Sequence, residues 1–355
     1  MQEQRPQGQP GRGISRTALW VAAARAVGAR EPDAAIRNPD RLAERLLGDA
    51  ALRDLDHPVV DALGKSYEDA MQDIEVASMV RAMTERTRFI DQALERAVAE
   101  GITQCLVVGA GFDSHAYRCR ELLERVRIFE LDRPETMAFK RQRVDTALGG
   151  PPANLTYVAA DLERETLSEA LARHGYDLSR RTFVIMEGVS MYVVEEAICA
   201  TFRFFAAHAP GSSVVFDFAT RTMIDGMNAV DLEKLPAAAR PPVERILKMI
   251  RDEPWVFGIP LDGEKAFLAG LGLELREMVT IGSEESVRRF LTRADGTTMG
   301  AEAHARALAF QNAMRQRLLT MDPAQREQAE ASMREQIRQN AYRIAEAVVP
   351  AQEGK

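Results

Sequence analysis

Short apolar runs alternate with amphipathic stretches of helical spacing from about residue 101 onward. The runs are rich in Val, Ile, Leu and Phe, as strands buried on both faces of a sheet require. Strands that alternate with helices predict an α/β fold with a parallel, doubly wound sheet. We expect strands at residues 104–108, 127–131, 155–159, 182–186 and 213–218, with the last two at 273–281 and 341–349.

The N-terminal part of the chain lacks such runs and shows helical spacing instead. Ser15 is an N-cap candidate, and Leu19, Ala23 and Val27 follow it at nearly helical intervals. Because these helices precede the first strand, residues 14–100 are expected to form a helical cap over the ligand edge of the sheet. The alternative is that these helices only pack against the rest of the protein and do not cover a ligand site. The expected helices span residues 17–25, 39–47 and 66–100.

Three further segments depart from the alternation. Residues 1–13 are rich in Gln, Pro and Gly and are expected to be a disordered tail. Residues 220–260 hold several prolines and are too long for a simple turn, so we expect an inserted lid before a helix at 264–271. Residues 295–340 are charged and predict a helical insertion, so 101–355 would be a core domain with two insertions.

Composition limits the classes of partner. With 355 residues, 46% of them hydrophobic, the chain can bury a substantial core. Its formal net charge of −7 argues against a nucleic-acid surface, which needs an excess of clustered lysine and arginine. No signal peptide and no bilayer-spanning stretch is evident, so we expect a cytoplasmic protein without a membrane partner. The sequence does not indicate an oligomeric state.

Metal binding is not expected either. The chain has no H-E-x-x-H cluster among its five histidines. Its three cysteines lack metal-ligand spacing and are expected to be reduced core thiols: Cys105, Cys119 and Cys199.

Two glycines mark the place where the first buried strand breaks into a helix. Gly109 and Gly111 flank Ala110 directly after the apolar run that ends at Val108. Glycines at such a place allow a tight turn and let a ligand lie against bare backbone. The turn therefore predicts a nucleotide-like cofactor.

The residues around this turn favour one cofactor over another. A dinucleotide site has a third glycine where this chain has Ser114, preceded by Asp113. A carboxylate there would repel pyrophosphate but attract the cationic end of S-adenosylmethionine. Asp132, at the tip of the second expected strand, is placed to accept both ribose hydroxyls. Together these residues indicate a class I methyltransferase site.

Four motifs, in order and spacing, carry a family resemblance. They are VVGAGFDSHAYR at 107–118, FELDRP at 129–134 with Lys140, ADL at 160–162 and MEGVSMY at 186–192. Over about residues 15–293 the chain resembles the leucine carboxyl methyltransferases and the related bacterial polyketide O-methyltransferases. The resemblance implies a Rossmann-like class I methyltransferase fold with a mostly parallel seven-stranded sheet and S-adenosylmethionine as cofactor.

The resemblance also implies roles for residues at the strand ends. Glu187, followed by Gly188, would contact the cofactor at its methionine amino group. Asp161 would accept the adenine amino group while Leu162 supplies a backbone contact; taken alone, a strand-end Asp is more often a helix cap. Tyr192 would face the transferring methyl from the substrate side, with half-buried packing as the alternative.

An arginine is the expected partner of the methionine carboxylate, because its planar fork binds a carboxylate with two parallel hydrogen bonds. Arg86 and Arg88 both precede the first strand by about one helix. Two positions apart on a helix, they face different directions and cannot share one role. The resemblance favours Arg86, with a surface salt bridge as the alternative for both. His115 varies in the family and is not expected to be a fixed base.

The reaction itself asks little of the protein. The methyl group of a sulfonium is already activated, so the protein mainly aligns the reactants and excludes water. A carboxylate acceptor needs no base at pH 7, whereas an alcohol or phenol usually does. Because no unambiguous base is visible, we expect transfer to a carboxylate or a readily ionised hydroxyl of a small molecule.

The N-terminus bears on the substrate. Eukaryotic members of the resembled family carry a cofactor-contacting lysine in the first helix, where this chain offers Arg16 and Thr17. A protein C-terminal leucine is therefore not the expected substrate, and a small metabolite of bacterial secondary metabolism is preferred.

Two alternatives stay open. Some relatives cyclise S-adenosylmethionine to azetidine-2-carboxylate and methylthioadenosine, which needs no second substrate. The other alternative is a non-catalytic cofactor-binding scaffold. In such a protein, the cofactor motifs are expected to have lost residues. The motif residues present here are Gly109, Gly111, Asp132, Asp161 and Glu187.

Overall fold

Seven strands form one sheet in the order β3-β2-β1-β4-β5-β7-β6. The structure is a computed structural model and describes residues 15–48, 55–162, 164–234, 240–303, 305, 339 and 341–351. The five strands from β3 to β5 are parallel, and β7 runs antiparallel to both β5 and β6. The expected doubly wound, mostly parallel sheet is confirmed. Its strand order reverses between β1 and β4, the point at which such sheets bind ligands.

All seven expected strands form, with ends displaced by at most one residue. Burial on both faces requires continuous apolar runs, which are easily recognised in a sequence. The strands are β1 (Gln104–Val108), β2 (Arg127–Asp132), β3 (Leu155–Ala159), β4 (Thr182–Met186), β5 (Ser213–Ala219), β6 (Glu274–Thr280) and β7 (Tyr342–Val348).

Helices cover both faces of this sheet and create two cores. Alternate residues of β1 point to opposite sides, so that Cys105 and Val107 join one core while Leu106 and Val108 join the other. The first core is covered by α6 (Ile74–Ala99), α7 (His115–Arg118), α8 (Pro134–Leu148) and α14 (Glu284–Phe290). The second is covered by α9 (Leu167–Ala172), α10 (Glu195–Ala206) and α13 (Glu264–Ala269).

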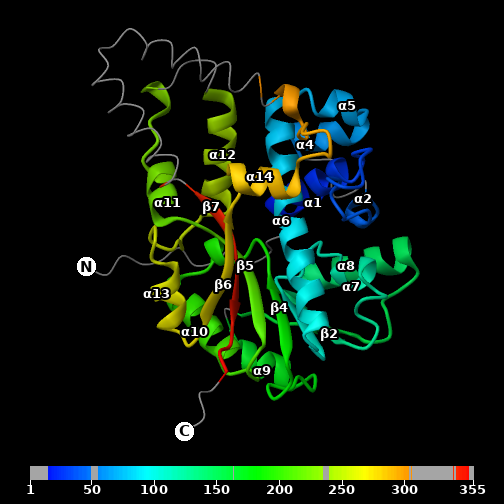
Figure 1. Ribbon diagram of the computed structural model, residues 1–355, viewed down its shortest axis with the longest axis vertical. Coiled ribbons are helices and arrows are strands. Elements are labelled where there is room, and N and C mark those ends of the chain that lie inside the picture. The colour runs from blue at the N-terminus through cyan, green and yellow to red at the C-terminus, as the bar shows by residue number, and fades with distance from the viewer. Residues whose placement is uncertain are drawn as a thin grey trace.

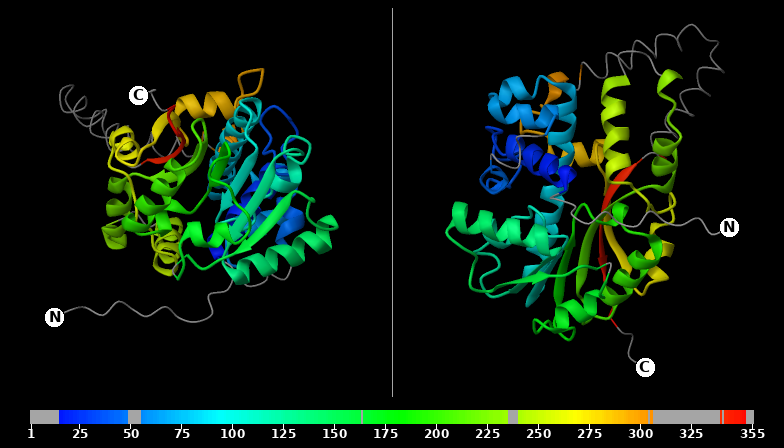
Figure 2. Two further views of the ribbon diagram at one scale, coloured as in Figure 1. Left: turned by 90° about the horizontal axis from the view of Figure 1, so that it is seen from below. Right: turned by 180° about the vertical axis from the view of Figure 1, so that it is seen from behind.

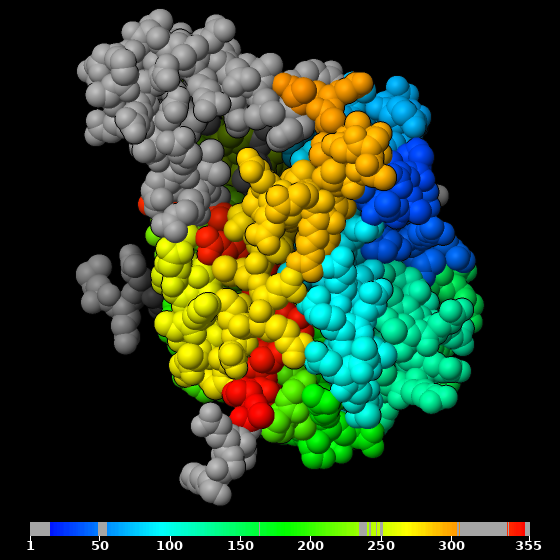
Figure 3. All heavy atoms as spheres, in the orientation of Figure 1, coloured from blue at the N-terminus to red at the C-terminus, as the bar shows by residue number. Residues whose placement is uncertain are grey.

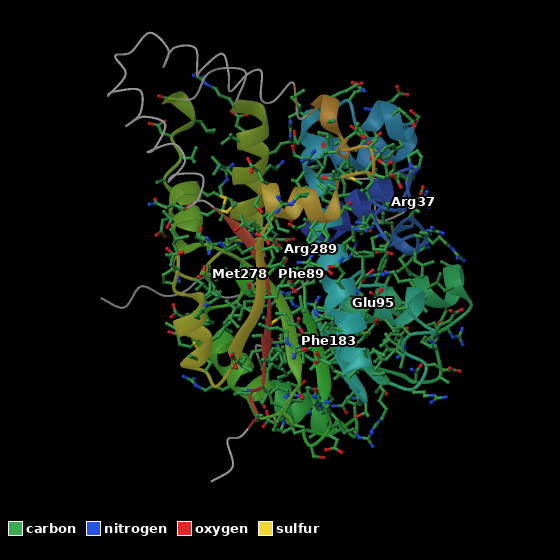
Figure 4. All side chains as sticks on the ribbon, in the orientation of Figure 1. Arg37, Phe89, Glu95, Phe183, Met278 and Arg289 are labelled. Atoms are coloured by element: carbon green, nitrogen blue, oxygen red, sulfur yellow. The ribbon has the colours of Figure 1, made fainter. Side chains whose placement is uncertain are left out.

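The long helix α6 ties the N-terminal helices to the sheet (Figure 1). Phe89 of α6 packs against Phe290 of α14 with ring centroids 6.5 Å apart, and the Arg289 guanidinium lies over the Phe89 ring (Figure 4). Further along α6, Arg96 binds Glu277 of β6 and Glu346 of β7 at 2.7 and 2.8 Å. Figure 3 shows α6 beside these two strands on the molecular surface.

Two expected helices are shorter than predicted. The helix expected at 66–100 is interrupted, because the Asp73 side chain accepts from the backbone of Glu75 and Val76 and starts a new helix. Its first part is α5 (Tyr67–Ala70). The helix expected at 39–47 begins only with α2 (Ala43–Leu47), since Asp40 caps Leu42 N–H and so favours a turn.

Two groups of helices lie beyond the carboxyl end of the parallel strands, one on each side (Figures 1 and 2). One contains α1 (Arg16–Gly28), α2, α4 (Pro58–Asp61) and α5. The other contains α11 (Arg221–Asn228) and α12 (Arg240–Asp252), which lie in the segment predicted as a lid. A bridge between Thr220 and Ile259 closes this excursion at its base.

The second group also contacts the long helix α6. Arg245 of α12 pairs with Glu75 at the start of α6, with Nε 3.0 Å from Oε1. Among the described residues, no helix combines the length and the apolar character that a membrane span requires. The predicted tail at 1–13 and most of the helical insertion predicted at 295–340 lie outside the described residues.

Candidate active site

The glycine turn after β1 has a backbone that only glycine adopts without strain. Gly109 has φ +69°, and a Cβ there would lie 2.4 Å from Val189 Cγ2. Gly111 has φ +34°. The left-handed region and the close approach of Val189 both exclude a larger residue at 109. The conformation of the turn therefore depends on the positive φ values of its glycines and on the close approach of Val189.

Two side chains hold this turn in place. Asp132 Oδ2 accepts the Gly111 N–H at 2.7 Å, and its Oδ1 accepts the Arg133 N–H at 2.7 Å. Burial raises the pKa of Asp132. Lys140 donates from Nζ to the Ala110 carbonyl at 3.1 Å. The structure thus places Asp132 directly beside the turn, where the motif spacing puts it.

Lys140 is itself held by a buried polar group under the turn. Its Nζ lies 2.8 Å from Glu130 Oε2, and Tyr117 donates to the same carboxylate at 3.1 Å. Burial raises the pKa of Glu130 to about 7. The phenols of Tyr117 and Tyr157 are 2.9 Å apart. The carboxylate therefore has partners that offset the cost of burying it.

Asp113 is bound by its neighbour rather than left free. Asp113 Oδ1 accepts the His115 backbone N–H at 2.9 Å, and Asp113 Oδ2 lies 2.7 Å from His115 Nδ1. On its other side His115 Nε2 faces Asp91 Oδ1 at 3.1 Å, and Arg118 donates to Asp91 Oδ2 at 2.7 Å. Burial would raise the pKa of Asp113, but the His115 imidazole lowers it below its usual range. The Asp113 charge is thus directed at His115.

This pair predicts a loss of stability at alkaline pH. Burial alone would lower the pKa of His115, yet Asp113 raises it to about 9. A histidine whose pKa is raised above its ordinary value of about 6.5 stabilises the fold fully below that value. The contribution is lost as the pH rises through 9. We expect the free energy of unfolding to fall by roughly 3 kcal/mol across this range, measured by urea denaturation.

The matched variant is His115→Gln, whose side chain cannot titrate. Its free energy of unfolding is expected to be lower than that of the wild type at pH 6 and to change less between pH 6.5 and 9. Parallel profiles for the two proteins would show that His115 is not the titrating group.

A second cluster lies where β4 and β5 end. Arg86 of α6 places Nη2 2.5 Å from Glu187 Oε1 and Nη1 2.8 Å from Asp217 Oδ2. Asp217 also accepts the Gly188 N–H at 2.7 Å and the Tyr342 hydroxyl. Gly188 has φ +66°, which favours glycine there. The cluster fixes the turn after β4.

Arg25 of α1 connects this cluster to the glycine turn. Its Nη1 lies 3.3 Å from Glu187 Oε1, and its Nη2 donates to the Phe112 carbonyl at 2.8 Å. Its Nε lies 3.3 Å from Asp40 Oδ2. The cation that the first helix brings to Glu187 is therefore Arg25, whereas the backbone N–H of Arg16 donates to Glu253.

Sequence reasoning missed Arg25, Asp217 and Tyr342. Arg25 stands among alanines in an apolar helix, and Asp217 interrupts the apolar run of β5. A charge inside an otherwise buried pattern requires a partner, so both positions carried a usable signal. Tyr342 at the start of a strand carried none.

Arg86 and Arg88 have different partners in the structure. Arg88 Nη1 donates to the Arg37 carbonyl at 3.0 Å, away from the strand ends. Arg86 is buried against Glu187, as described above. Of the two arginines, only Arg86 therefore reaches the carboxyl edge of the sheet.

Two buried atoms of the cluster lack a partner among the described residues. They are Glu187 Oε2 and Arg86 Nε. Burial would raise the pKa of Glu187, but Arg86 and Arg25 lower it, so the carboxylate is ionised. Unpaired buried polar atoms are rare and costly in native proteins, and a ligand is one way to satisfy them. The amino and carboxylate groups of an amino acid have the complementary charges.

Asp161 and Leu162 follow β3 at the same edge. The Ala160 N–H donates to the Asp132 carbonyl at 2.9 Å, which brings this loop beside Asp132. Asp161 is 3.4 Å from Arg164 Nε, with its side chain 35% exposed. Leu162 is 42% exposed. An exposed leucine in this loop is available to cover an apolar ligand face.

Tyr192 ends a short 3₁₀ helix (Ser190–Tyr192) that follows Gly188. Its ring packs edge to face on Trp255, with centroids 6.4 Å apart. Burial raises the pKa of Tyr192, so its phenol stays protonated near neutral pH. Among the described residues there is no group of three side chains suited to hold a metal ion.

Comparison with known proteins shows to which family this chain is related. The sequence profile of the leucine carboxyl methyltransferases matches residues 18–206. A protein from Mycolicibacterium vanbaalenii is 32% identical over 246 residues, which cover 65% of this chain and 73% of that protein. One from Mycobacterium bovis is 30% identical over 282 residues, covering 78% and 79%. Both are named as S-adenosyl-L-methionine-dependent methyltransferases.

The chain belongs to the leucine carboxyl methyltransferase family. It is a class I methyltransferase that depends on S-adenosylmethionine. Among solved structures, a DUF574 family protein from Streptomyces avermitilis aligns over 91% of this chain and 100% of that chain, with 17% identity and a TM-score of 0.48.

Proposed function

We propose that this member of the leucine carboxyl methyltransferase family transfers a methyl group to a carboxylate or hydroxyl oxygen of a small metabolite. The unpaired Glu187 Oε2, fully buried beside two arginines, is the observation that carries the cofactor assignment. S-adenosylmethionine supplies an activated methyl on a sulfonium, next to an ammonium and a carboxylate. Glu187 would bind the ammonium and Arg86 the carboxylate.

The remaining residues at the strand ends would bind the rest of the cofactor. Asp132 would accept the ribose hydroxyls. Asp161 and Leu162 would lie against the adenine. The turn backbone at Gly109, Ala110, Gly111 and Gly188 would form the floor of the site, and Asp113 would set the conformation of the turn through His115.

The side chains near the expected methyl group support an acceptor oxygen that does not depend on a strong base in the protein. Tyr192 is protonated, and His115 is held between two carboxylates. Neither is a free base beside the strand ends, so the acceptor needs a low pKa of its own. The resemblance to polyketide O-methyltransferases supports a metabolite of bacterial secondary metabolism as this acceptor.

Asp132→Ala tests the cofactor assignment. Each hydrogen bond from ribose to a carboxylate is worth about 1.5–3 kcal/mol, so affinity for S-adenosylhomocysteine should fall by about tenfold or more. Methylthioadenosine, which keeps the ribose but lacks the amino acid, should lose affinity by the same factor. Isothermal titration calorimetry measures both.

Asp132→Asn is the matched variant, because it keeps an acceptor for one of the two backbone N–H groups that Asp132 binds. Unchanged affinity of both variants for both ligands would contradict the ribose assignment. With S-adenosylmethionine alone, no methylthioadenosine should form; its release would indicate cyclisation instead of methyl transfer.

A further inference from the structure

The peptide between Ala110 and Gly111 is held from both sides. It is trans, so its C=O and N–H point in opposite directions. The Gly111 N–H donates to Asp132 Oδ2 at 2.7 Å, and the Ala110 carbonyl accepts from Lys140 Nζ at 3.1 Å. Asp132 ends β2, and Lys140 lies in α8. One peptide therefore links a carboxylate of the expected cofactor site to a buried lysine under the turn.

The space around Gly111 leaves this peptide room to rotate. The nearest atoms to a Cβ placed on Gly111 would be the Gly109 carbonyl oxygen at 3.7 Å and Asp132 Oδ2 at 4.0 Å. At Gly109, in contrast, Val189 fills the corresponding space. Glycine adopts φ values of either sign at little cost, so the peptide that precedes it can turn over. The orientation of this peptide therefore depends on the hydrogen bonds at its two ends.

The Ala110 carbonyl accepts from one donor inside the turn and from one outside it. The Asp113 N–H donates to it at 2.7 Å, but Asp113 belongs to the same turn and can move with it. Lys140 comes from α8, is 3% exposed, and has its Nζ 2.8 Å from Glu130 Oε2. An ammonium that moved away would leave a buried carboxylate without its cation, which is costly. Lys140 is therefore the fixed donor for this carbonyl.

A rotated peptide would disturb Asp132. The Ala110 carbonyl oxygen would then face the Asp132 carboxylate in place of the Gly111 N–H, and the two negative oxygens would repel each other. Of the two backbone N–H groups that orient Asp132, the Arg133 N–H at 2.7 Å would remain. The carboxylate would turn away from the repelling carbonyl and lose the orientation in which it faces the ribose hydroxyls.

We propose that Lys140 is a positioning residue for the cofactor. By holding the Ala110 carbonyl, it keeps the Gly111 N–H on Asp132. Asp132 is thereby directed at the ribose, while Lys140 itself acts only through the peptide. This inference rests on the proposed function, in which Asp132 binds the ribose. Loss of Lys140 should therefore weaken every ligand that contains the ribose, and only as long as Asp132 is present.

The test uses variants that do not leave a buried charge unpaired. Lys140→Met alone would strand the Glu130 carboxylate and destabilise the fold. We therefore compare Glu130→Gln with a neutral-pair variant that carries both Glu130→Gln and Lys140→Met, each in the full-length protein. Replacing both partners of a buried ion pair by neutral side chains of similar size is often nearly neutral for stability. Urea denaturation checks that both variants fold.

Calorimetry with S-adenosylhomocysteine and with methylthioadenosine measures the effect on binding. The neutral-pair variant should bind both ligands about tenfold more weakly than Glu130→Gln does, because both ligands contain the ribose. In the Asp132→Ala background, adding the same two substitutions should change the affinity for S-adenosylhomocysteine by less than about twofold. Equal affinity of Glu130→Gln and the neutral-pair variant would overturn the proposal. A further tenfold loss in the Asp132→Ala background would do the same, since Lys140 would then act independently of Asp132.

The Gly111 amide gives a readout that a general stabilising role of Lys140 would not change. Its N–H donates to a carboxylate in the wild type, which displaces the amide proton resonance downfield. With isotope-labelled glycine, we expect the displacement to persist in Glu130→Gln and to be lost in the neutral-pair variant. A resonance that stays displaced in the neutral-pair variant would show that the peptide keeps its orientation without Lys140, and the proposal would be wrong.

The outcomes also separate this inference from the proposed function. Wild-type affinity of Asp132→Ala for both ligands would refute the ribose assignment itself. A loss of affinity in Asp132→Ala, together with equal affinities of Glu130→Gln and the neutral-pair variant, would leave that assignment intact and refute only the role of Lys140.

Discussion

Asp217→Ala is expected to lower the free energy of unfolding by about 3–5 kcal/mol, the cost of removing one partner from a buried ion pair. Asp217 is fully buried and binds Arg86 Nη1 at 2.8 Å. It also accepts from the Gly188 N–H and the Tyr342 hydroxyl. The variant therefore leaves a buried guanidinium, an amide and a phenol without their shared acceptor. Urea or thermal denaturation measures the change.

An exposed pair provides the control. Glu195 lies 3.4 Å from Arg221, with 61% of its side chain exposed, so Glu195→Ala should cost less than about 1 kcal/mol. If Asp217→Ala were no more destabilising than Glu195→Ala, the remaining Glu187 would be a sufficient partner for Arg86. The cluster would then contribute little to stability.

Glu187→Gln is expected to weaken S-adenosylhomocysteine binding by about tenfold to a hundredfold. Hydrogen bonds to charged groups are worth about 1.5–3 kcal/mol, and each 1.4 kcal/mol is a factor of ten in affinity. The substitution removes the charge that faces the expected ammonium and leaves Arg25 and Arg86 to repel it. Methylthioadenosine has no ammonium, so its affinity should stay unchanged. Calorimetry with the two ligands gives the comparison.

The pattern across variants distinguishes a lost contact from a collapsed site. Asp132→Ala should weaken both ligands, and Glu187→Gln only the ligand with an amino acid. Equal loss of methylthioadenosine binding in Glu187→Gln would mean that Glu187 supports the site as a whole. Circular dichroism of each variant checks that the fold is retained.

The sheet could be predicted from the sequence almost residue by residue. A strand buried on both faces must be apolar along its whole length. Turn residues at its two ends mark where the apolar run stops. The glycine turn was equally readable, because φ values of +69° and +34° at 109 and 111 exclude most other residues. The position of Asp132 could also be predicted, because parallel strands have their carboxyl ends, with their polar residues, at one edge of the sheet.

Helix ends were less readable because short polar side chains decide them locally. Asp73 and Asp40 each bind backbone N–H groups, and these bonds compete with helix continuation. A hydrophobic pattern contains no information about that competition. The predicted helices at 66–100 and 39–47 were accordingly too long.

Charge pairing was decided only by the tertiary structure. The sequence determined which apolar positions are buried and which strand ends share an edge, because both follow from local patterns. It did not determine that Arg25 of α1 and Arg86 of α6 share Glu187, or that Asp217 joins Arg86 to Tyr342, which lies 256 positions after Arg86 in the chain. The free energy of a buried charge depends on every charge within a few ångströms, and helices far apart in sequence bring those charges together.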